Sequence, residues 1–87
     1  MEEVPPFSHE AQALQPGIYQ HYKGNRYKAI GVARHSETLE ELVVYQAMYG
    51  DESTWVRPLK MFLETVQTDA GPKPRFQMTT WQIWRTI

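Results

Sequence analysis

Apolar and polar side chains alternate along the chain from residue 17 onward, a pattern typical of half-buried β-strands. The strongest expected strand spans residues 42–49, which are rich in β-branched and aromatic side chains. Shorter strands are expected on either side of it, at residues 18–22, 29–33, 54–57, 65–67 and 75–77. The pattern therefore predicts a mainly β protein.

Glycines mark two special positions in the first pair of strands. Gly24 and Asn25 suit the left-handed backbone of a tight turn, so residues 17–35 are expected to form a hairpin. Gly31 lies inside the second strand, where a glycine indicates a β-bulge or the close approach of another backbone.

Prolines and short segments punctuate the second half of the chain. Pro58 ends a strand because proline cannot donate to a strand ladder, and residues 59–64 are long enough for only one helical turn. Residues 69–74 carry a glycine and two prolines and are expected to form a loop. Four to six short antiparallel strands with one short helical turn predict a small barrel resembling the Src-homology-3 type, which leaves no strand edge exposed. A curled antiparallel sheet with a C-terminal helix is the alternative.

A chain of 87 residues has room for one domain, which we place at residues 17–77. Residues 1–16 contain three prolines and are expected to form an extended or mobile arm, draped over the barrel where it is ordered. A short helical turn over residues 8–14 would have Ser8 as its cap. Residues 78–87 are too apolar to remain in water, so this tail is expected to dock on the barrel or on a second chain.

Composition excludes several classes of protein. Cysteine is absent, which rules out disulfides and thiolate metal sites and suits a reducing cytoplasm, where we expect the protein to work. No apolar run reaches the roughly 18 residues that span a bilayer, so no membrane partner is expected. His9, His21 and His35 lack metal-ligand spacing, and no glycine-rich phosphate loop is present. We therefore expect neither a metal nor a cofactor.

Charge is divided along the chain although the net charge is only −1. Residues 17–35 carry bases and no acid, whereas residues 36–54 carry acids and no base. The near-neutral total argues against a strongly basic polyanion-binding protein, but it leaves room for a local basic patch. Aromatic rings combined with cations hold single-stranded nucleic acid. The alternative is that half of these tyrosines fill the core and the cations form a solvated face.

Residues 34–38 place a histidine beside a serine and a glutamate, residue types that serve general-base catalysis. Side chains of adjacent turn residues diverge, so turn stabilisation explains Ser36, Glu37 and Thr38 more simply. We expect a ligand contact by Arg34 or His35 rather than catalysis.

Trp55 near a loop, with Tyr49 across from it, is typical of grooves in small barrels where polyproline peptides dock. The alternative is that Trp55 and Phe62 complete a core that needs large side chains.

Five segments together are similar to one known family. They read Gly17-x-Tyr-x-His-Tyr-Lys-Gly-x-x-Tyr27, Val32-Ala-Arg-His-Ser-Glu-Thr38, Leu42-Val-Val-Tyr45, Tyr49-Gly-Asp51 and Trp55-Val-Arg-Pro-Leu-x-Met-Phe-x-Glu-x-Val66. Over residues 16–76 the chain thus resembles the bacterial family catalogued as domain of unknown function 1653. The resemblance implies a compact, mainly β, cytoplasmic domain and brings no established activity, cofactor or catalytic residue. The arm and the tail lie outside the pattern.

These observations favour a non-enzymatic binding module for a peptide or a single-stranded nucleic acid, with no catalytic residue. One alternative is a small-molecule sensor or small enzyme that uses His21 or His35. Another is a structural module that self-associates through the tail. The expected ligand-binding side chains are Tyr19, His21, Arg34, His35, Tyr49, Trp55 and Arg57.

Overall fold

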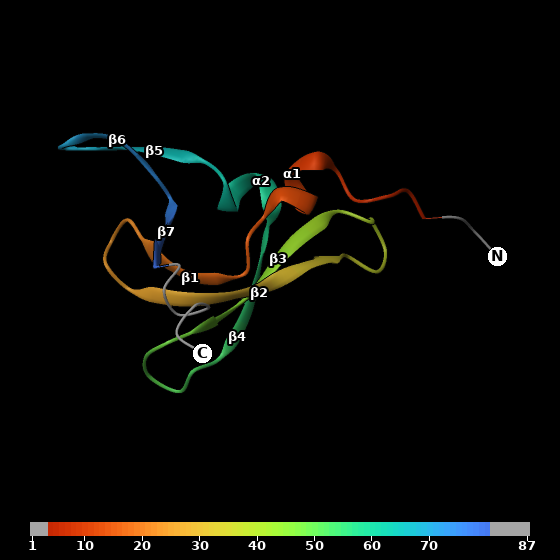
Figure 1. Ribbon diagram of the computed structural model, residues 1–87, viewed down its shortest axis with the longest axis horizontal. Helices are drawn as coiled ribbons and strands as arrows, with labels where there is room; N and C mark the ends of the chain where they lie inside the picture. The colour runs from red at the N-terminus through yellow and green to blue at the C-terminus, as the bar shows by residue number, and fades with distance from the viewer. Residues whose placement is uncertain (1–3, 81–87) are drawn as a thin grey trace.

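The computed structural model describes residues 4–80, and the predicted tail therefore lies largely outside the described residues. The chain is mainly β, as predicted (Figure 1). Five strands form an antiparallel sheet in the order β4-β3-β2-β1-β7, and β5 pairs with β6 in a second, two-stranded sheet. The elements are α1 (His9–Ala13), β1 (Gly17–His21), β2 (Arg26–Arg34), β3 (Glu41–Ala47), β4 (Thr54–Pro58), α2 (Leu59–Phe62), β5 (Thr65–Thr68), β6 (Gly71–Pro74) and β7 (Phe76–Thr80).

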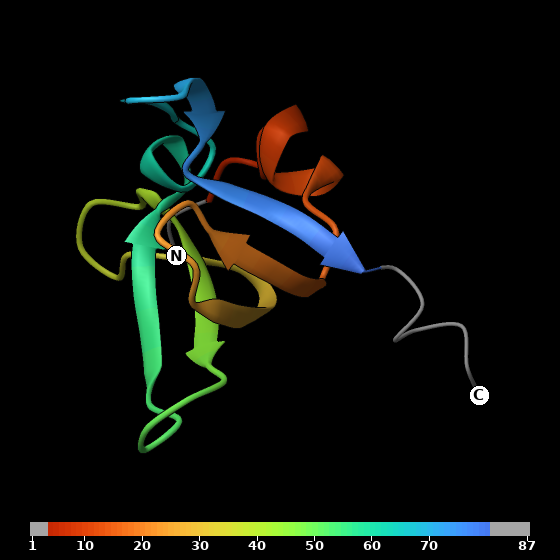
Figure 2. The same cartoon turned by 90° about the vertical axis from the view of Figure 1, so that its left-hand side faces the viewer.

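The prediction of a closed barrel is wrong. The five-stranded sheet is open, with β4 at one edge and β7 at the other, and no pairing within residues 4–80 joins these two strands. Figure 2 shows β7 beside β1 on one side of the molecule and β3 with β4 on the other. After β4, the chain passes through α2 and the β5–β6 hairpin before it returns to β1. The residues of β5 and β6 pair with each other and not with either edge of the five-stranded sheet.

Residues 69–74 do not form the predicted loop. Gly71–Pro74 is strand β6, which pairs with β5 across the two-residue turn at residues 69 and 70. Pro72 and Pro74 are compatible with this strand because they alternate with Lys73, so both missing N–H groups fall on the side facing away from β5.

Both expected helical turns are confirmed. Ser8 is the N-cap of α1, and its hydroxyl accepts a hydrogen bond of 3.1 Å from the backbone N–H of Ala11. The single turn of α2 begins directly after Pro58. None of the helices in residues 4–80 has the length and apolar character needed to cross a membrane.

The expected bulge is also confirmed. Ala29 pairs with Tyr45, and Gly31 pairs with Val44, so Ile30 is an extra residue in β2. In the first hairpin, Gly24 has a φ of 115°, a left-handed conformation that glycine adopts readily.

Aromatic side chains fill the core between the five-stranded sheet and the two helical turns. Phe62 from α2 is 1% exposed and stacks on Phe76 from β7, with ring centroids 4.2 Å apart and planes at 6°. Val43, at the centre of the sheet, is fully buried. Phe7 and Leu14 from the N-terminal segment pack against the same cluster. The core members are Ala11, Tyr19, Ala29, Val43, Tyr45, Leu59, Phe62 and Phe76.

Candidate functional site

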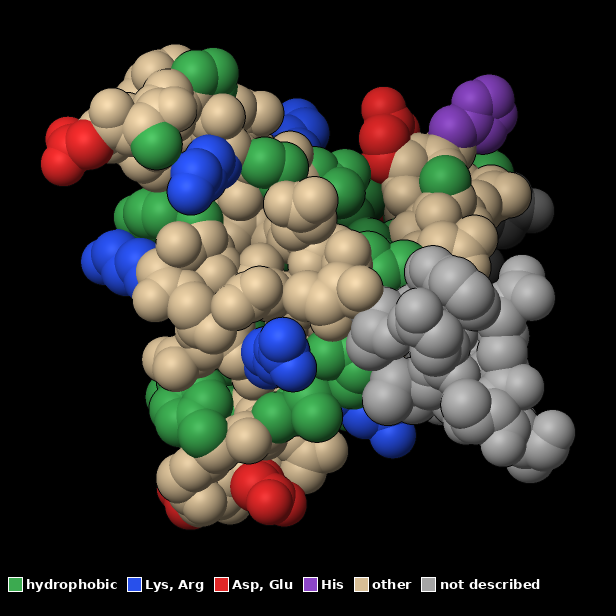
Figure 3. Space-filling view, turned by 60° about the vertical axis from the view of Figure 1, so that its left-hand side comes forward, with side chains coloured by type: hydrophobic (Ala, Val, Ile, Leu, Met, Phe, Trp, Pro, Cys, Tyr) green, Lys and Arg blue, Asp and Glu red, His purple; other side chains and the backbone are tan. Residues whose placement is uncertain are grey.

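A hollow in the surface lies where the β1–β2 hairpin meets β6 and β7. We call it the basic groove. It has a volume of about 570 Å³, and none of its lining residues is acidic. Figure 3 views this side of the molecule, with Lys and Arg side chains over its middle and upper parts and Asp and Glu side chains at its margins. The groove is lined by Gln20, His21, Tyr22, Gly24, Arg26, Lys73, Pro74, Gln77, Met78 and Thr79.

Two cations approach the groove from different sheets. Arg26 begins β2 and Lys73 lies in β6, and both side chains are exposed. The ion pair within residues 4–80 joins Arg75 to Glu64, with 2.9 Å between the guanidinium Nη2 and the carboxylate Oε1. No carboxylate within residues 4–80 forms an ion pair with Arg26 or Lys73, so both cations can bind an anion.

His21, one of the residues expected to bind a ligand, lines the groove. Its ring contacts Phe76 edge-on, with centroids 4.9 Å apart, and lies 4.6 Å from the Tyr22 ring. The Nδ1 atom of His21 accepts a hydrogen bond from the backbone N–H of Lys23, so the neutral ring carries its proton on Nε2.

The surroundings of His21 are electropositive. Burial lowers the pKa of His21 below its usual value, and the charges of Arg57, Arg75 and Lys23 lower it further. The three cations, unlike the burial, would also attract an anion to this place.

An aromatic ring stands beside these cations. Tyr22 lines the groove, and the Lys23 ammonium lies 5.8 Å from the centre of its ring. Such a ring can accept a stacked base next to a bound phosphate.

Arg57 lies close to the groove without lining it. Its guanidinium is 5.5 Å from the centre of the Phe76 ring, and its Nε donates to the Tyr45 hydroxyl at 3.3 Å. The side chain is half-buried and fixed by these two contacts. Arg57 thus contributes positive charge near His21 without lining the groove.

Tyr19, which was expected to bind a ligand, lies in the core. Its ring is buried and contacts Phe62 edge-on at 5.3 Å, and its hydroxyl donates to the backbone carbonyl of Gln15 at 2.7 Å. Burial raises the pKa of Tyr19. Its described contacts are those of a core residue.

Arg34 binds the chain's own N-terminal segment. The guanidinium lies 3.9 Å from the centre of the Phe7 ring, and its Nη2 donates to the backbone carbonyl of Pro5 at 2.6 Å. The contacts expected with a ligand are thus occupied by residues of the same chain.

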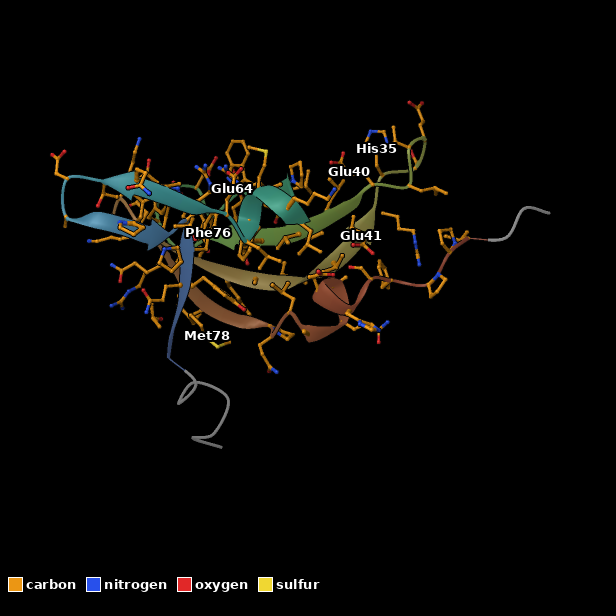
Figure 4. The ribbon with its side chains drawn as sticks, turned by 90° about the horizontal axis from the view of Figure 1, so that it is seen from above. His35, Glu40, Glu41, Glu64, Phe76 and Met78 are labelled. Carbon is orange, nitrogen blue, oxygen red and sulfur yellow. The ribbon has the colours of Figure 1, made fainter. Side chains whose placement is uncertain are left out.

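His35 stabilises a turn. Its Nδ1 atom accepts hydrogen bonds from the backbone N–H groups of Glu37 and Thr38, at 3.1 and 3.3 Å. In Figure 4, His35 lies with Glu40 and Glu41 at one end of the molecule, whereas Phe76, which contacts His21, lies towards the other end. The structure therefore does not bring the two candidate histidines together.

Tyr49 and Trp55 lie at the β3–β4 hairpin, outside the basic groove. Trp55 is 55% exposed and Tyr49 is 47% exposed. The Tyr49 hydroxyl is hydrogen-bonded to the Tyr27 hydroxyl at 2.8 Å, and the two rings meet edge-on. The described contacts thus tie Tyr49 to its own sheet and leave Trp55 on the surface.

The sequence did not indicate the part of the groove that β6 and β7 line. Lys73, Gln77, Met78 and Thr79 line it but were not expected to bind a ligand. The available signal was Lys73, an isolated cation between two prolines, and its position depended on whether residues 71–74 form a strand.

A second, smaller hollow of about 230 Å³ is lined by Glu40, Glu41, Leu59 and Lys60. Its charges are mixed and show no preference for one kind of ligand. Within residues 4–80, no three His, Asp or Glu side chains gather closely enough to hold a metal ion.

Comparisons with known proteins agree with the fold. The sequence model of a family described as "Protein of unknown function (DUF1653)" matches residues 17–78. The chain is also similar to a crystal structure of a protein belonging to DUF1653 from Bordetella bronchiseptica, at 45% identity and a TM-score of 0.75. The match covers 79% of this chain and 91% of the other. A comparison with curated proteins finds no match.

Proposed function

The chain belongs to the DUF1653 family of proteins of unknown function, and we propose that it is a non-enzymatic binding module for single-stranded nucleic acid. The basic groove is the proposed binding site. The observation that carries the proposal is the composition of its lining: Arg26, Lys73 and His21 with no carboxylate, next to the ring of Tyr22.

The two exposed cations suit the backbone of the ligand. Arg26 and Lys73 both line the groove and come from different sheets, so either or both can contact a phosphate bound there. Arginine and lysine are the side chains that most often neutralise nucleic-acid phosphates. A base next to that phosphate would stack on Tyr22, and Gln20 and Gln77 offer hydrogen bonds to its edge.

The size of the groove suits a short stretch of single strand. Pockets for small ligands usually have volumes of about 300–1,000 Å³, and the 570 Å³ of the groove lies within that range. A duplex presents its phosphates on a wide convex surface with its bases stacked inside. A groove of this size therefore favours one strand with an unstacked base.

A peptide ligand has weaker support. Two of the residues expected to bind it, Arg34 and His35, already bind the N-terminal segment and a turn of the same chain. Trp55 and Tyr49 lie on a different hairpin from the basic groove. The alternative of a small-molecule sensor or small enzyme that uses His21 or His35 has weaker support, because the Nδ1 atom of each ring already accepts a hydrogen bond from a backbone N–H of its own turn.

The proposal also includes the expected type of fold and the expected location of the protein. The strand order β4-β3-β2-β1-β7, with one helical turn before the chain returns to β1, supports an open relative of the Src-homology-3-like barrel. The cysteine-free sequence supports a reducing cytoplasm as the place of binding. Small barrels host many functions, so the groove and not the fold carries the proposal.

Binding of a fluorescently labelled single-stranded oligonucleotide, measured by anisotropy over a range of salt concentrations, tests the proposal. We expect the logarithm of the binding constant to fall linearly with the logarithm of salt concentration. The variants Arg26→Ala and Lys73→Ala should each reduce that slope by about 0.7, the value for one phosphate contact on a single strand. Tyr22→Ala should weaken binding by about 5- to 150-fold, equivalent to one lost stacking contact of about 1–3 kcal/mol.

Lys60→Ala is the matched control, because Lys60 is an exposed cation on α2 outside the groove. It should leave the salt slope unchanged. Absence of binding at low salt would overturn the proposal, and so would equal losses in Lys60→Ala and Lys73→Ala. Salt-insensitive binding of a proline-rich peptide that depends on Trp55 would support the peptide reading instead.

A further inference from the structure

The sheet has a second face that the described core does not cover. Side chains alternate along β3, so Val43, Tyr45 and Ala47 point into the core and are buried. Leu42 and Val44 between them point to the opposite side, which we call the outer face.

The strand register makes this outer face apolar. Val44 pairs with Gly31 on one side and Val56 on the other, and Leu42 pairs with Ala33 and Pro58. The bulge adds Ile30 beside Gly31. Ile30 is 51% exposed and Val56 is 56% exposed. From the bulge to Pro58 every outer-face position is apolar, and such a continuous patch indicates an interaction surface.

The chain leaves the described structure next to this face. Ile18 of β1 points to the same side of the sheet as the outer face, because it pairs with Lys28 while the next residue, Tyr19, pairs with Tyr27 on the core side; Ile18 itself is buried. Thr80, the last described residue of β7, pairs with Ile18. The remaining residues therefore begin at the margin of the outer face.

We propose that residues 81–87, Trp-Gln-Ile-Trp-Arg-Thr-Ile, cover the outer face of their own chain. These seven residues contain two tryptophans and two isoleucines and carry one charge. Each buried aromatic side chain removes about 150–250 Å² from water, so docking would shield the apolar surface of both the tail and the sheet.

The length of the tail is sufficient. Neighbouring strands lie about 4.8 Å apart, so across the sheet β3, which carries Val44, is about 14 Å from β7 and β4, which carries Val56, is about 19 Å from it. Seven extended residues span up to about 23 Å, and the tail can therefore reach Val44 and Val56.

The tail's own sheet is favoured over that of a second copy. A tether that starts at the margin of the face holds the tail at a local concentration in the millimolar range, far above the usual concentration of the protein. Because the tail is long enough to reach the outer face, docking within one chain is favoured at protein concentrations too low for docking between chains.

Tryptophan fluorescence tests this proposal in the full chain. Trp55→Phe removes the tryptophan of β4, so the remaining emission comes from Trp81 and Trp84. We expect emission at shorter wavelength than that of free tryptophan, and slow quenching by acrylamide. In that background Ile30→Asp or Val56→Asp should shift the emission to the wavelength of free tryptophan and accelerate the quenching.

Leu63→Asp is the matched control, because Leu63 is 48% exposed but lies beside α2 and not on the outer face. It should leave the emission unchanged. Circular dichroism of each variant shows whether its strands are retained, which distinguishes loss of docking from unfolding. Emission unaffected by Val56→Asp would overturn the proposal. A shift that appears only at high protein concentration, with a dimer in sedimentation, would overturn it in favour of a second copy.

Discussion

Ser8 and Glu41, which are 33 positions apart in the chain, are joined by two hydrogen bonds. The Ser8 backbone N–H and its hydroxyl each donate to a different oxygen of the Glu41 carboxylate at 2.7 Å. Arg34, which pairs with Glu41 across the strands, holds Pro5 and Phe7 of the same N-terminal segment. The segment predicted to be an extended or mobile arm is thus fastened to the end of the sheet at three successive points.

This fastening should be sensitive to acid. The hydrogen bonds from Ser8 hold the pKa of Glu41 below its ordinary value of 4.5. A carboxyl group with a depressed pKa in the folded state stabilises that state above its unfolded pKa, and the stabilisation is lost as the pH falls through the folded pKa. We expect the amides of α1 to lose protection from hydrogen exchange as the pH falls below about 4.5, before the core amides do.

Glu41→Gln should give the same loss of α1 protection at neutral pH, because the amide cannot replace the carboxylate charge. Glu37→Gln makes the same chemical change at an exposed turn residue and should have no effect. Equal protection of α1 in wild type and Glu41→Gln would contradict the prediction.

Phe62 should be essential for stability. It contacts Tyr19, Tyr45 and Phe76, and its replacement by alanine leaves a cavity among rings. Phe62→Ala should lower the free energy of unfolding by about 3–5 kcal/mol, a large part of the total for a small domain. Urea unfolding measures this change. Leu63→Ala, at the exposed neighbouring position, should cost much less, and similar losses in both variants would contradict the prediction.

The hydroxyl of Tyr27 should titrate abnormally. Burial and the Tyr49 hydroxyl raise the pKa of Tyr27 to about 12. Tyr49→Phe removes the hydrogen bond and the charge but keeps the ring, so the pKa of Tyr27 should fall towards its usual value of 10.0. Absorbance of tyrosinate against pH measures the change. In Tyr27→Phe the ionisation at the highest pH should be missing, which assigns it to Tyr27. An identical titration curve in Tyr49→Phe would be the contrary result.

The raised pKa of Tyr27 also predicts the direction of alkaline unfolding. Folding favours the neutral phenol, so its stabilisation is complete below pH 10 and is lost as the pH rises through about 12. Urea unfolding at several alkaline pH values should show stability falling over this range, and falling less in Tyr27→Phe.

Nucleic-acid binding should depend on the protonation of His21. Burial and the cations Arg57, Arg75 and Lys23 lower its pKa, and a phosphate bound in the groove would offset those charges. The pKa of His21 should therefore rise when an oligonucleotide binds, and affinity should increase as the pH falls through the range between the bound and free values. Nuclear magnetic resonance of the histidine ring measures both pKa values. His21→Asn should bind with little dependence on pH in this range, whereas an unchanged pH dependence would exclude His21 from the site.

Local features of the fold could be predicted because each depends on residues close together in the chain. The Ser8 cap, the bulge at Gly31 and the helical turn after Pro58 all follow from the conformational preferences of single residues and their immediate neighbours. The strands before Pro58 follow from alternation alone. The prediction of a loop at residues 69–74 was wrong, because prolines are excluded from a central strand but are tolerated in an edge strand such as β6.

The candidate site was predicted only in part, for a different reason. Of the residues that line the groove, His21 was among those expected from the sequence, because rings and cations are adjacent in the first hairpin. Lys73 is brought to the same groove by the β5–β6 hairpin, which no local pattern places there. Arg34 was expected to meet a ligand and instead holds Phe7, a partner 27 positions earlier in the chain.

The order of apolar and polar residues was enough to establish a mainly β chain, its turns, and its division into basic and acidic stretches, because those properties arise from short-range preferences. The tertiary structure alone decided that the sheet stays open, that the N-terminal segment is fastened by Glu41 and Arg34, and that cations from two sheets share one groove. Each of these depends on packing between distant segments, whose free energy cannot be assigned to any single stretch of residues.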